Sequence, residues 1–140
     1  MKTTISFSSP SSLESESLVA VVLDHAEPTP NQKESKPQLQ VASTDPAVQS
    51  VAADLLSSGE VTGKAFETNL MHRPVTVMAK RLLLVSGGSA KKFSSYDLRR
   101  IAGAAVRALK SRGIRSFAFI APPGIPAEEA VRAIVEGAHI

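Results

Sequence analysis

The fold of this chain is decided by one continuous apolar run, Leu18-Val19-Ala20-Val21-Val22-Leu23. Such a run of aliphatic residues is typical of a central strand that is covered on both faces, because neither face is left polar for water. A second run, Arg81-Leu82-Leu83-Leu84-Val85, predicts another buried strand. Since both faces of such a sheet need helices to cover them, the two runs favour an α/β domain.

Three helices are expected around these strands. Asp45 can cap a helix that starts at Pro46 and that Gly59 ends. A longer helix is expected from Ser94 or Ser95 to about Arg112, because its apolar residues recur at helical spacing. Its apolar face consists of Leu98, Ile101, Ala102, Ala105, Val106 and Leu109. A last helix starts at Pro126, and in it Val131, Ile134 and Val135 are expected to face inward.

The remaining segments complete an alternation of strands and helices. Further strands are expected at residues 2–8, 67–73, 75–85 and 114–120, and Gly87-Gly88 is expected to end the strand at 75–85. Residues 25–44 are rich in Pro, Gln, Glu and Ser, which predicts a flexible polar loop. The sequence therefore predicts a single domain over residues 1–140, with a partly parallel sheet covered by helices.

The composition excludes several kinds of site. The 140 residues include no cysteine, which excludes disulfides, thiolate metal ligands and a cysteine nucleophile. His25, His72 and His139 have no partners at metal-binding spacing, and there is no Gly-x-Ser-x-Gly motif. We therefore expect no catalytic and no metal-binding residues in this chain. The sequence shows neither a signal peptide nor a run long enough to cross a bilayer, so we expect a cytoplasmic location without a membrane partner.

The net charge of +3 hides an uneven distribution of charge. Residues 1–63 carry a net charge of −5, residues 64–115 carry +10, and residues 116–140 carry −2. A basic segment can attract polyanions such as DNA. The candidate side chains for this contact are Lys91, Lys92, Arg99, Arg100, Arg107 and Lys110. A helix face that is merely solvated is the alternative, and the sequence leaves both interpretations open.

Two glycine positions raise further hypotheses. Gly87 and Gly88 follow a strand and precede a helix, so their backbone amides could bind an anion. Their spacing matches neither the dinucleotide-binding nor the P-loop motif, which favours a plain connecting loop. Gly103 lies on the polar side of the longest helix, where glycine is unfavourable. It is either simply tolerated, or another chain or domain approaches the helix there.

Four segments of the chain follow one another in an order that a known family shares. They are Leu56 to Thr68, which contains Thr62-Gly63-Lys64; Ala79 to Gly88, which contains Lys80-Arg81-Leu82-Leu83-Leu84-Val85; Tyr96 to Lys110, which contains Ile101-Ala102-Gly103-Ala104-Ala105-Val106; and Ala130 to Gly137. Together these segments resemble the N-terminal domain of the cytosol (leucyl) aminopeptidases, the M17 metallopeptidases. Ser86 departs from the pattern, which commonly has glycine there, and residues 9–16 and 25–44 match none of it.

The resemblance implies a fold like that of macro domains, a three-layer arrangement with a mixed sheet between helices. It also implies a separate C-terminal catalytic domain with two divalent metals, zinc or manganese, and a hexamer of the full-length protein. The metal ligands of that family come from a Lys, Asp and Glu set that includes an Asn-Thr-Asp-Ala-Glu-Gly-Arg-Leu segment. No such segment occurs here. We therefore expect the catalytic domain to be absent from this chain.

Three hypotheses about function follow. The first is a non-catalytic domain of an aminopeptidase that removes N-terminal amino acids, with a role in assembly, substrate access or regulation. The second is a module that binds DNA or another polyanion through its basic helix. The third, and least favoured, is a domain that binds an ADP-ribose-type ligand at Gly87-Gly88, because the asparagine-rich and glycine-rich ligand loops of macro domains are absent.

Overall fold

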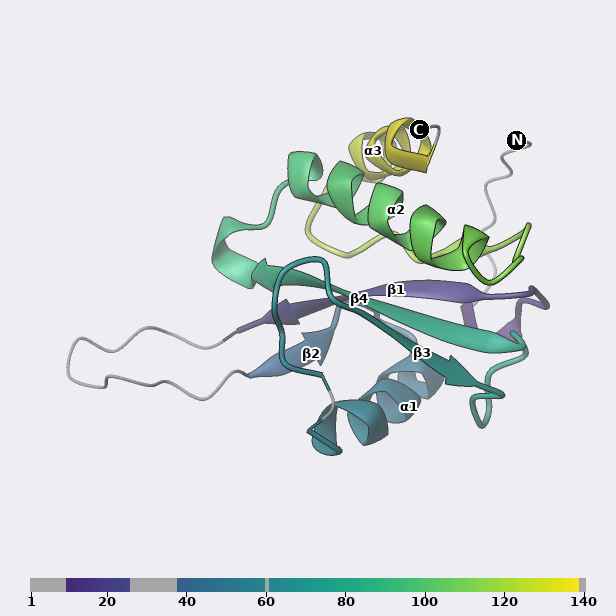
Figure 1. The fold of residues 1–140 in the computed structure, drawn as a ribbon. Coiled ribbons are helices and arrows are strands. Elements are labelled where there is room, and N and C mark those ends of the chain that lie inside the picture. The colour runs from purple at the N-terminus through teal and green to yellow at the C-terminus, as the bar shows by residue number, and fades with distance from the viewer. Residues whose placement is uncertain (1–9, 26–37, 60, 139–140) are drawn as a thin grey trace.

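The computed structural model describes residues 10–25, 38–59 and 61–138 (Figure 1). Its strands are β1 (Leu18–Asp24), β2 (Leu39–Val41), β3 (Thr68–His72), β4 (Arg81–Ser89) and β5 (Ala118–Phe119). Its helices are α1 (Pro46–Ser57), α2 (Ser95–Lys110) and α3 (Ala127–Ala138), with short 3-10 turns at Pro10–Ser12 and Ala90–Lys92. None of the helices in these ranges has the length and apolar character needed to cross a membrane.

The two apolar runs become the two central strands of a mixed sheet. β1 and β4 are parallel, with Leu18 beside Leu82 and Val21 beside Val85. β3 lies antiparallel on the outer side of β4. On the other side of β1, β5 pairs in parallel with its first residues, whereas β2 pairs antiparallel with its last residues. The expected partly parallel sheet is therefore confirmed.

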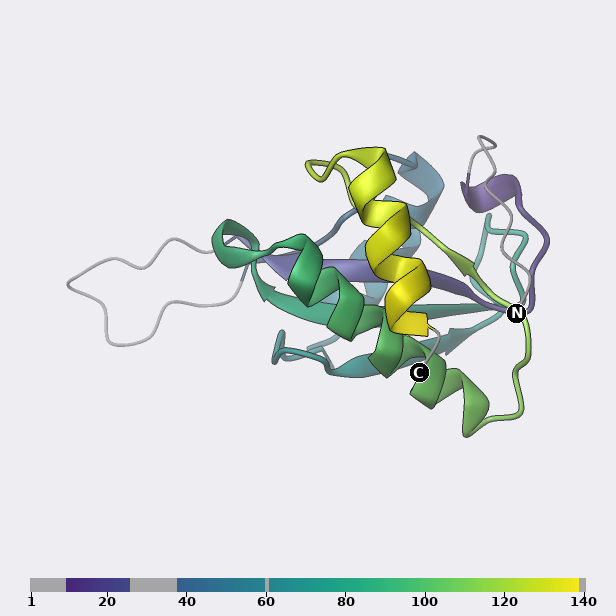
Figure 2. The ribbon, with the colours of Figure 1, turned by 90° about the horizontal axis from the view of Figure 1, so that it is seen from above.

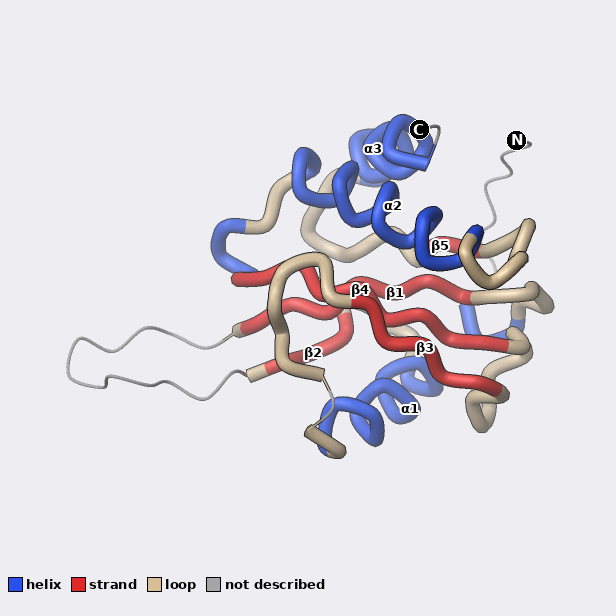
Figure 3. The backbone as a smooth tube through the Cα atoms, viewed as in Figure 1, coloured by secondary structure: helices blue, strands red, loops and turns tan. Residues whose placement is uncertain are grey.

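Helices cover both faces of this sheet (Figures 1 and 3). Successive side chains of a strand point to opposite faces, so β1 contributes to two cores. Val19 and Val21 belong to the core beneath α2, and Ala20 and Val22 belong to the core against α1. The predicted α/β class, a mixed sheet flanked by helices, is thereby confirmed.

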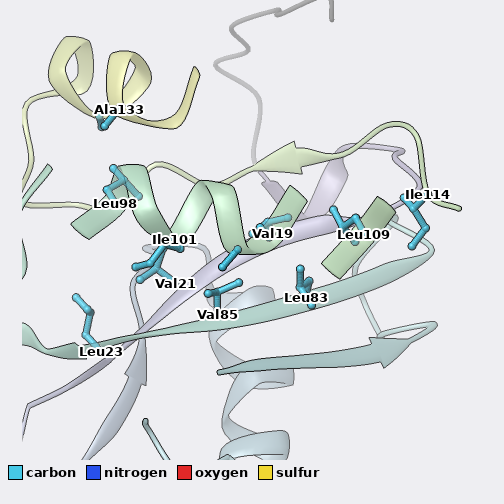
Figure 4. Packing of buried hydrophobic residues seen from close by; sticks show 13 residues of the cluster. Val19, Val21, Leu23, Leu83, Val85, Leu98, Ile101, Leu109, Ile114 and Ala133 are labelled. Carbon is cyan, nitrogen blue, oxygen red and sulfur yellow. The ribbon is translucent and has the colours of Figure 1, made fainter. Parts of the chain in front are cut away.

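The α2 side of the sheet carries a second helix stacked over the first (Figure 2). Leu98, Ile101 and Leu109 of α2 pack on Val21 and Leu83 of the sheet (Figure 4). The residues of α2 from 101 to 106 are all buried, including Gly103. The sheet can bury only the side of α2 that faces it, so another element must bury the opposite side. That element is α3, which packs against α2. The segment that approaches α2 there is thus a helix of the same chain.

The face that α3 buries differs from the predicted one. Val131, Ile134 and Val135 are only partly buried, whereas Ala130, Ala133 and Gly137 are buried. A Cβ atom added to Gly137 would lie 2.0 Å from the carbonyl oxygen of Arg99. The two helix backbones therefore approach so closely that small residues, and not the large aliphatic ones, must lie between them.

Several predicted boundaries were wrong. The loop expected over 25–44 contains β2, which pairs with β1 at residues 39–41. The strands expected at 75–85 and 114–120 are shorter, since residues 75–80 form a turn and only Ala118 and Phe119 pair as β5. The strand expected at 2–8, and residues 26–37 of the expected loop, lie outside the described residues.

Candidate functional site

Loops and a helix N-terminus meet where β1 and β4 end. β4 leads into α2 on one face of the sheet, and α1 lies on the other face (Figure 1). In open α/β sheets, ligands often bind outside the carboxyl ends of such neighbouring parallel strands. The candidate glycines, the basic side chains and the loop at residues 61–67 all lie near this end or along α2.

Gly87 and Gly88 lie within β4, so the prediction that they end the strand and form a loop was wrong. Between Val22 and Asp24 of β1, the partner strand advances from Ser86 to Ser89, which places one extra residue in β4. Gly88 has a φ of +79°, a conformation that glycine adopts easily, and this fits a β-bulge. A Cβ added to Gly87 would lie within 3.0 Å of Leu23, Ile101 and Phe93. The glycine pair therefore serves the packing of β4 beneath α2.

The loop at 61–67 is ordered by the carboxylate of Glu67. This carboxylate accepts hydrogen bonds from the backbone N–H and hydroxyl of Thr62 and from the side-chain amide of Asn69. The hydrogen bond from the Thr62 hydroxyl is the main cause that lowers the pKa of Glu67 below its ordinary value. The loop begins with Val61, buried beside α1, and ends with Phe66 on the α2 side of the sheet. It thus runs from one face of the sheet to the other.

Arg100 is held against two aromatic rings. Its guanidinium carbon lies 4.5 Å from the ring centre of Phe66 and 6.0 Å from that of Tyr96. Phe66 has a φ of +67°, which is unusual for a bulky residue and is maintained by a hydrogen bond from its N–H to the Ser86 carbonyl. The stack connects the 61–67 loop to α2 by a cation–π contact.

The six candidate basic residues are all exposed, but they do not form one cluster. Lys91 and Lys92 precede α2, and Lys110 ends it, so they are separated by the whole helix of about 24 Å. Arg99 lies 3.7 Å from the carboxylate of Glu136 on α3. Arg99 is thus paired, and Arg100 is stacked on Phe66. Among the described residues, the other two cations of α2, Arg107 and Lys110, show no ion pair or ring contact.

The described residues do not fit a two-metal centre. They contain no group of three or more His, Asp or Glu side chains close enough to hold a metal ion. His25 follows β1, and His72 ends β3 beside Arg81, so the two lie at opposite ends of the sheet. His139 is outside the described residues.

Two concave surfaces were not predicted from the sequence. One, of about 710 Å³, lies between β2 and α1 and is lined by Leu39, Val41, Ala53 and Leu56 among others. The other, of about 630 Å³, lies between the N-terminal part of α2 and α3 and is lined by charged side chains such as Arg99, Glu128 and Arg132. Neither includes Gly87 or Gly88. The surface beside α1 is lined by residues of β2. This strand was not predicted, because residues 25–44 have the composition of a polar loop.

The chain is similar to known proteins over most of its length. Residues 18–139 match the family described as "Cytosol aminopeptidase family, N-terminal domain". A probable cytosol aminopeptidase of Koribacter versatilis is 41% identical over 159 aligned residues, which cover 100% of this chain and 29% of the relative. One from Acidobacterium capsulatum is 34% identical, again over 100% of this chain and 28% of the relative.

A third relative, a probable cytosol aminopeptidase of Solibacter usitatus, is 44% identical over 62% of this chain and 18% of its own length. The chain thus spans less than a third of the length of these relatives. The matched range contains all of the strands and helices described above. The resemblance in the four sequence segments is confirmed, and the chain belongs to the cytosol aminopeptidase family, of which it carries the N-terminal domain.

Proposed function

We propose that this chain is the non-catalytic N-terminal domain of a cytoplasmic aminopeptidase, and that it serves assembly, substrate access or regulation of a catalytic domain elsewhere in the protein. One observation carries the proposal. The whole chain aligns with proteins named probable cytosol aminopeptidase, yet covers only 29% and 28% of two of them. In this proposal the remaining part removes N-terminal amino acids with the help of two divalent metals, zinc or manganese, and the full-length protein forms a hexamer.

A structural role is supported by the way the segments that carry the family resemblance pack into the fold. Gly87 packs under α2, Gly137 lets α3 approach α2, and the 61–67 loop joins the two faces of the sheet. This packing supports the proposal that the segments that carry the family resemblance serve as a scaffold.

The proposal is tested by measuring peptidase activity in two proteins. The 140-residue chain should cleave no aminopeptide substrate, with or without added zinc or manganese. The full-length protein that contains it should be active, and removal of residues 1–140 should change its oligomeric state or its preference for long over short peptides. Activity in the isolated chain, or a truncated protein with unchanged assembly and kinetics, would contradict the proposal.

A second candidate function is the binding of DNA or another polyanion. It is favoured by the exposure of all six candidate cations and by the net charge of +10 over residues 64–115. Arg99 pairs with Glu136, and Arg100 stacks on Phe66. We therefore expect Arg107 and Lys110 to be the residues of α2 that contact the polyanion.

A gel-shift measurement with duplex DNA tests this candidate. Arg107→Gln with Lys110→Gln should weaken a salt-sensitive shift, and Arg132→Gln on α3 is the matched control for loss of an exposed arginine. Absence of any shift at low salt would exclude the candidate.

A further inference from the structure

The outer edge of β2 is open in the part of the chain that the structure describes. There β2 pairs with β1 alone, antiparallel, and stands at the end of the strand order. The N–H of Ala42, directly after β2, donates to the Val21 carbonyl of β1. In an antiparallel pair, residues that bond to the partner strand alternate with residues whose backbone groups point away from it. Leu39 and Val41 therefore direct their N–H and C=O groups away from β1.

These backbone groups are available to a further strand. Within residues 10–25, 38–59 and 61–138, no hydrogen bond is made by the backbone of Leu39 or Val41. Proteins commonly protect an open sheet edge with charged side chains or proline. Residues 38–42, Gln-Leu-Gln-Val-Ala, contain neither. The edge of β2 thus offers two donors and two acceptors without such protection.

A concave surface runs along this edge. Its volume is about 710 Å³, and all of residues 38–41 line it. Since successive side chains of a strand point to opposite faces, a surface that all four residues line follows the edge of the strand. α1 forms the opposite wall with Gln49, Ala53 and Leu56, which lie four and three residues apart and hence on one side of the helix (Figure 3). We call this surface the β2–α1 groove.

One end of the β2–α1 groove is fixed by the 61–67 loop. Val61 is buried and lines the groove. A Cβ atom added to Gly63 would lie 2.7 Å from a terminal side-chain carbon of Leu39, so the loop packs against this side chain. The carboxylate of Glu67 orders the loop through its hydrogen bonds from Thr62. The groove is therefore formed before a partner binds, which lowers the entropic cost of binding.

The chemistry of the lining fits an uncharged stretch of peptide chain. The side chains of the lining are either aliphatic or polar without charge: Gln38, Leu39, Gln40, Val41, Gln49, Ala53, Leu56, Ser57 and Val61. Exposed Asp54 of α1 is not among them. The ammonium or carboxylate group at a free peptide end would lose water in this groove without gaining an opposite charge. The groove therefore favours an internal segment of a longer chain over the end of a short peptide.

We propose that the β2–α1 groove binds an internal, extended segment of a partner protein, which adds to the sheet as a strand beside β2. The backbone of this segment hydrogen-bonds to the N–H and C=O groups of Leu39 and Val41. Its aliphatic side chains, at alternate positions, lie between β2 and α1, and uncharged polar residues stand between them. In this mode of recognition the backbone bonds supply affinity and the alternate side chains supply specificity. The inference goes beyond the domain function proposed above, because it requires no catalytic domain.

The probe for the test is the pentapeptide acetyl-Thr-Val-Thr-Val-Thr-amide, whose blocked ends carry no charge. It is titrated into the isotope-labelled 140-residue chain, and NMR spectra of the backbone amides show where it binds. The amide signals of Leu39 and Val41 should move downfield, because their N–H groups gain acceptors. We expect a dissociation constant of about 0.1–1 mM for so short a segment.

Two modified peptides test the chemistry of the contact. N-methylation of the three internal residues keeps the side chains but removes the N–H donors, so this peptide should not bind. The same pentapeptide with free, charged ends should bind about threefold or more weakly than the blocked one.

Two variants of the chain test the place of the contact, and the same spectra show that each keeps its fold. Ala53→Arg puts a long charged side chain into the groove, and Ser50→Arg, on the same helix but outside the lining, is its control. Val41→Pro removes an outward N–H. Its control is His72→Pro on the other edge strand, β3, where the N–H of Arg73 bonds across the hairpin and that of His72 points away. Ala53→Arg and Val41→Pro should each weaken binding about tenfold, and the controls should bind as the unaltered chain does.

The inference is wrong if the amide signals of Leu39 and Val41 do not move during the titration. It is also wrong if the N-methylated peptide binds equally well, or if binding survives both Ala53→Arg and Val41→Pro. Shifts of the same signals with protein concentration alone would mean that a second copy occupies the edge, which likewise overturns the inference. None of these readouts depends on peptidase activity, so this failure is distinguishable from failure of the proposed domain function.

Discussion

The two faces of the sheet are covered in different ways. On one face α2 lies on the strands and α3 lies on α2, with Ala130, Ala133 and Gly137 at their contact. On the other face α1 covers the strands alone and leaves a groove of about 710 Å³ beside β2. Both faces begin from the same strands, β1 and β4, whose side chains alternate between them.

The difference shows that apolar burial alone does not decide how tightly a layer closes. The α2 face is covered by two helices whose backbones meet at small residues, and the concave surface between α2 and α3 is lined by charged side chains. The α1 face keeps an accessible, mainly apolar surface between β2 and α1.

The largest effect is expected from a pair of neighbouring leucines on β4. Leu83 faces the α2 core and Leu84 the α1 core, and each is 1% exposed. Leu→Ala at either position should lower the free energy of unfolding by about 2–5 kcal/mol. Leu83→Ala should lower the free energy of unfolding more than Leu84→Ala. The reason is that α3 packs on α2 and keeps it from moving into the cavity left by Leu83, whereas α1 can move into the cavity left by Leu84. Urea unfolding of both variants measures the difference, and equal losses would contradict the contrast between the faces.

The contact between α2 and α3 is tested at Gly137. In an exposed helix, replacing glycine with alanine stabilises by up to about 1 kcal/mol. Here Gly137→Ala should instead destabilise by about 1–3 kcal/mol, since its Cβ would lie 2.0 Å from the Arg99 carbonyl oxygen and 2.9 Å from Ala102. Thermal unfolding provides the measurement, with Glu129→Ala on the exposed side of α3 as the control. A stabilised Gly137→Ala would show that the helices are farther apart.

The loop that joins the two faces is tested through Glu67. Its carboxyl pKa is lowered from 4.5 in the folded state, so its contribution to stability is present above that pH and is lost as the pH falls through the lower folded-state pKa. Glu67→Gln should lower the free energy of unfolding by less than about 1 kcal/mol at neutral pH, because water competes for the hydrogen bonds. The difference between variant and unaltered chain should shrink toward zero in acid. Chemical unfolding at pH values on both sides of 4.5 tests this, and a constant difference would contradict it.

The smallest effect is expected at the ion pair between α2 and α3. Arg99 and Glu136 have side chains that are 57% and 49% exposed, so water and salt screen their attraction. Their coupling energy in a double-mutant cycle with Arg99→Ala and Glu136→Ala should be below about 1 kcal/mol and should fall with added salt. A coupling larger than the effect of Gly137→Ala would mean that charge, and not close packing, holds α3 on α2.

The main elements of the fold could be predicted from the sequence because their signals are local. The run at 18–23 identifies β1, and Asp45 with Pro46 identifies the start of α1, where the Asp45 side chain accepts a hydrogen bond from the Ala47 N–H. Ser94 and Asp97 form the capping box that starts α2. β2 escaped prediction because a three-residue strand in a polar segment is stabilised by pairing with β1 and carries no apolar pattern of its own.

The candidate site could be predicted only in part. The sequence identified which cations are exposed, since charged residues opposite an apolar helix face stay in water. It did not indicate that Arg99 pairs with Glu136 or that Arg100 covers Phe66, because the partners are 37 and 34 residues away. It also took Gly87 and Gly88 for a loop, because a glycine pair that ends a strand and one that forms a bulge within it look alike in sequence.

The sequence by itself determined the α/β class, the central strands, the starts of the helices and the family, since these depend on short segments whose order is preserved. Only the tertiary structure decided which face of α3 is buried, how the glycines of β4 are used, and where a concave surface remains open between β2 and α1. The physical reason is that these features arise where segments far apart in the chain approach one another, and the closeness of that approach is set by packing and not by any local pattern.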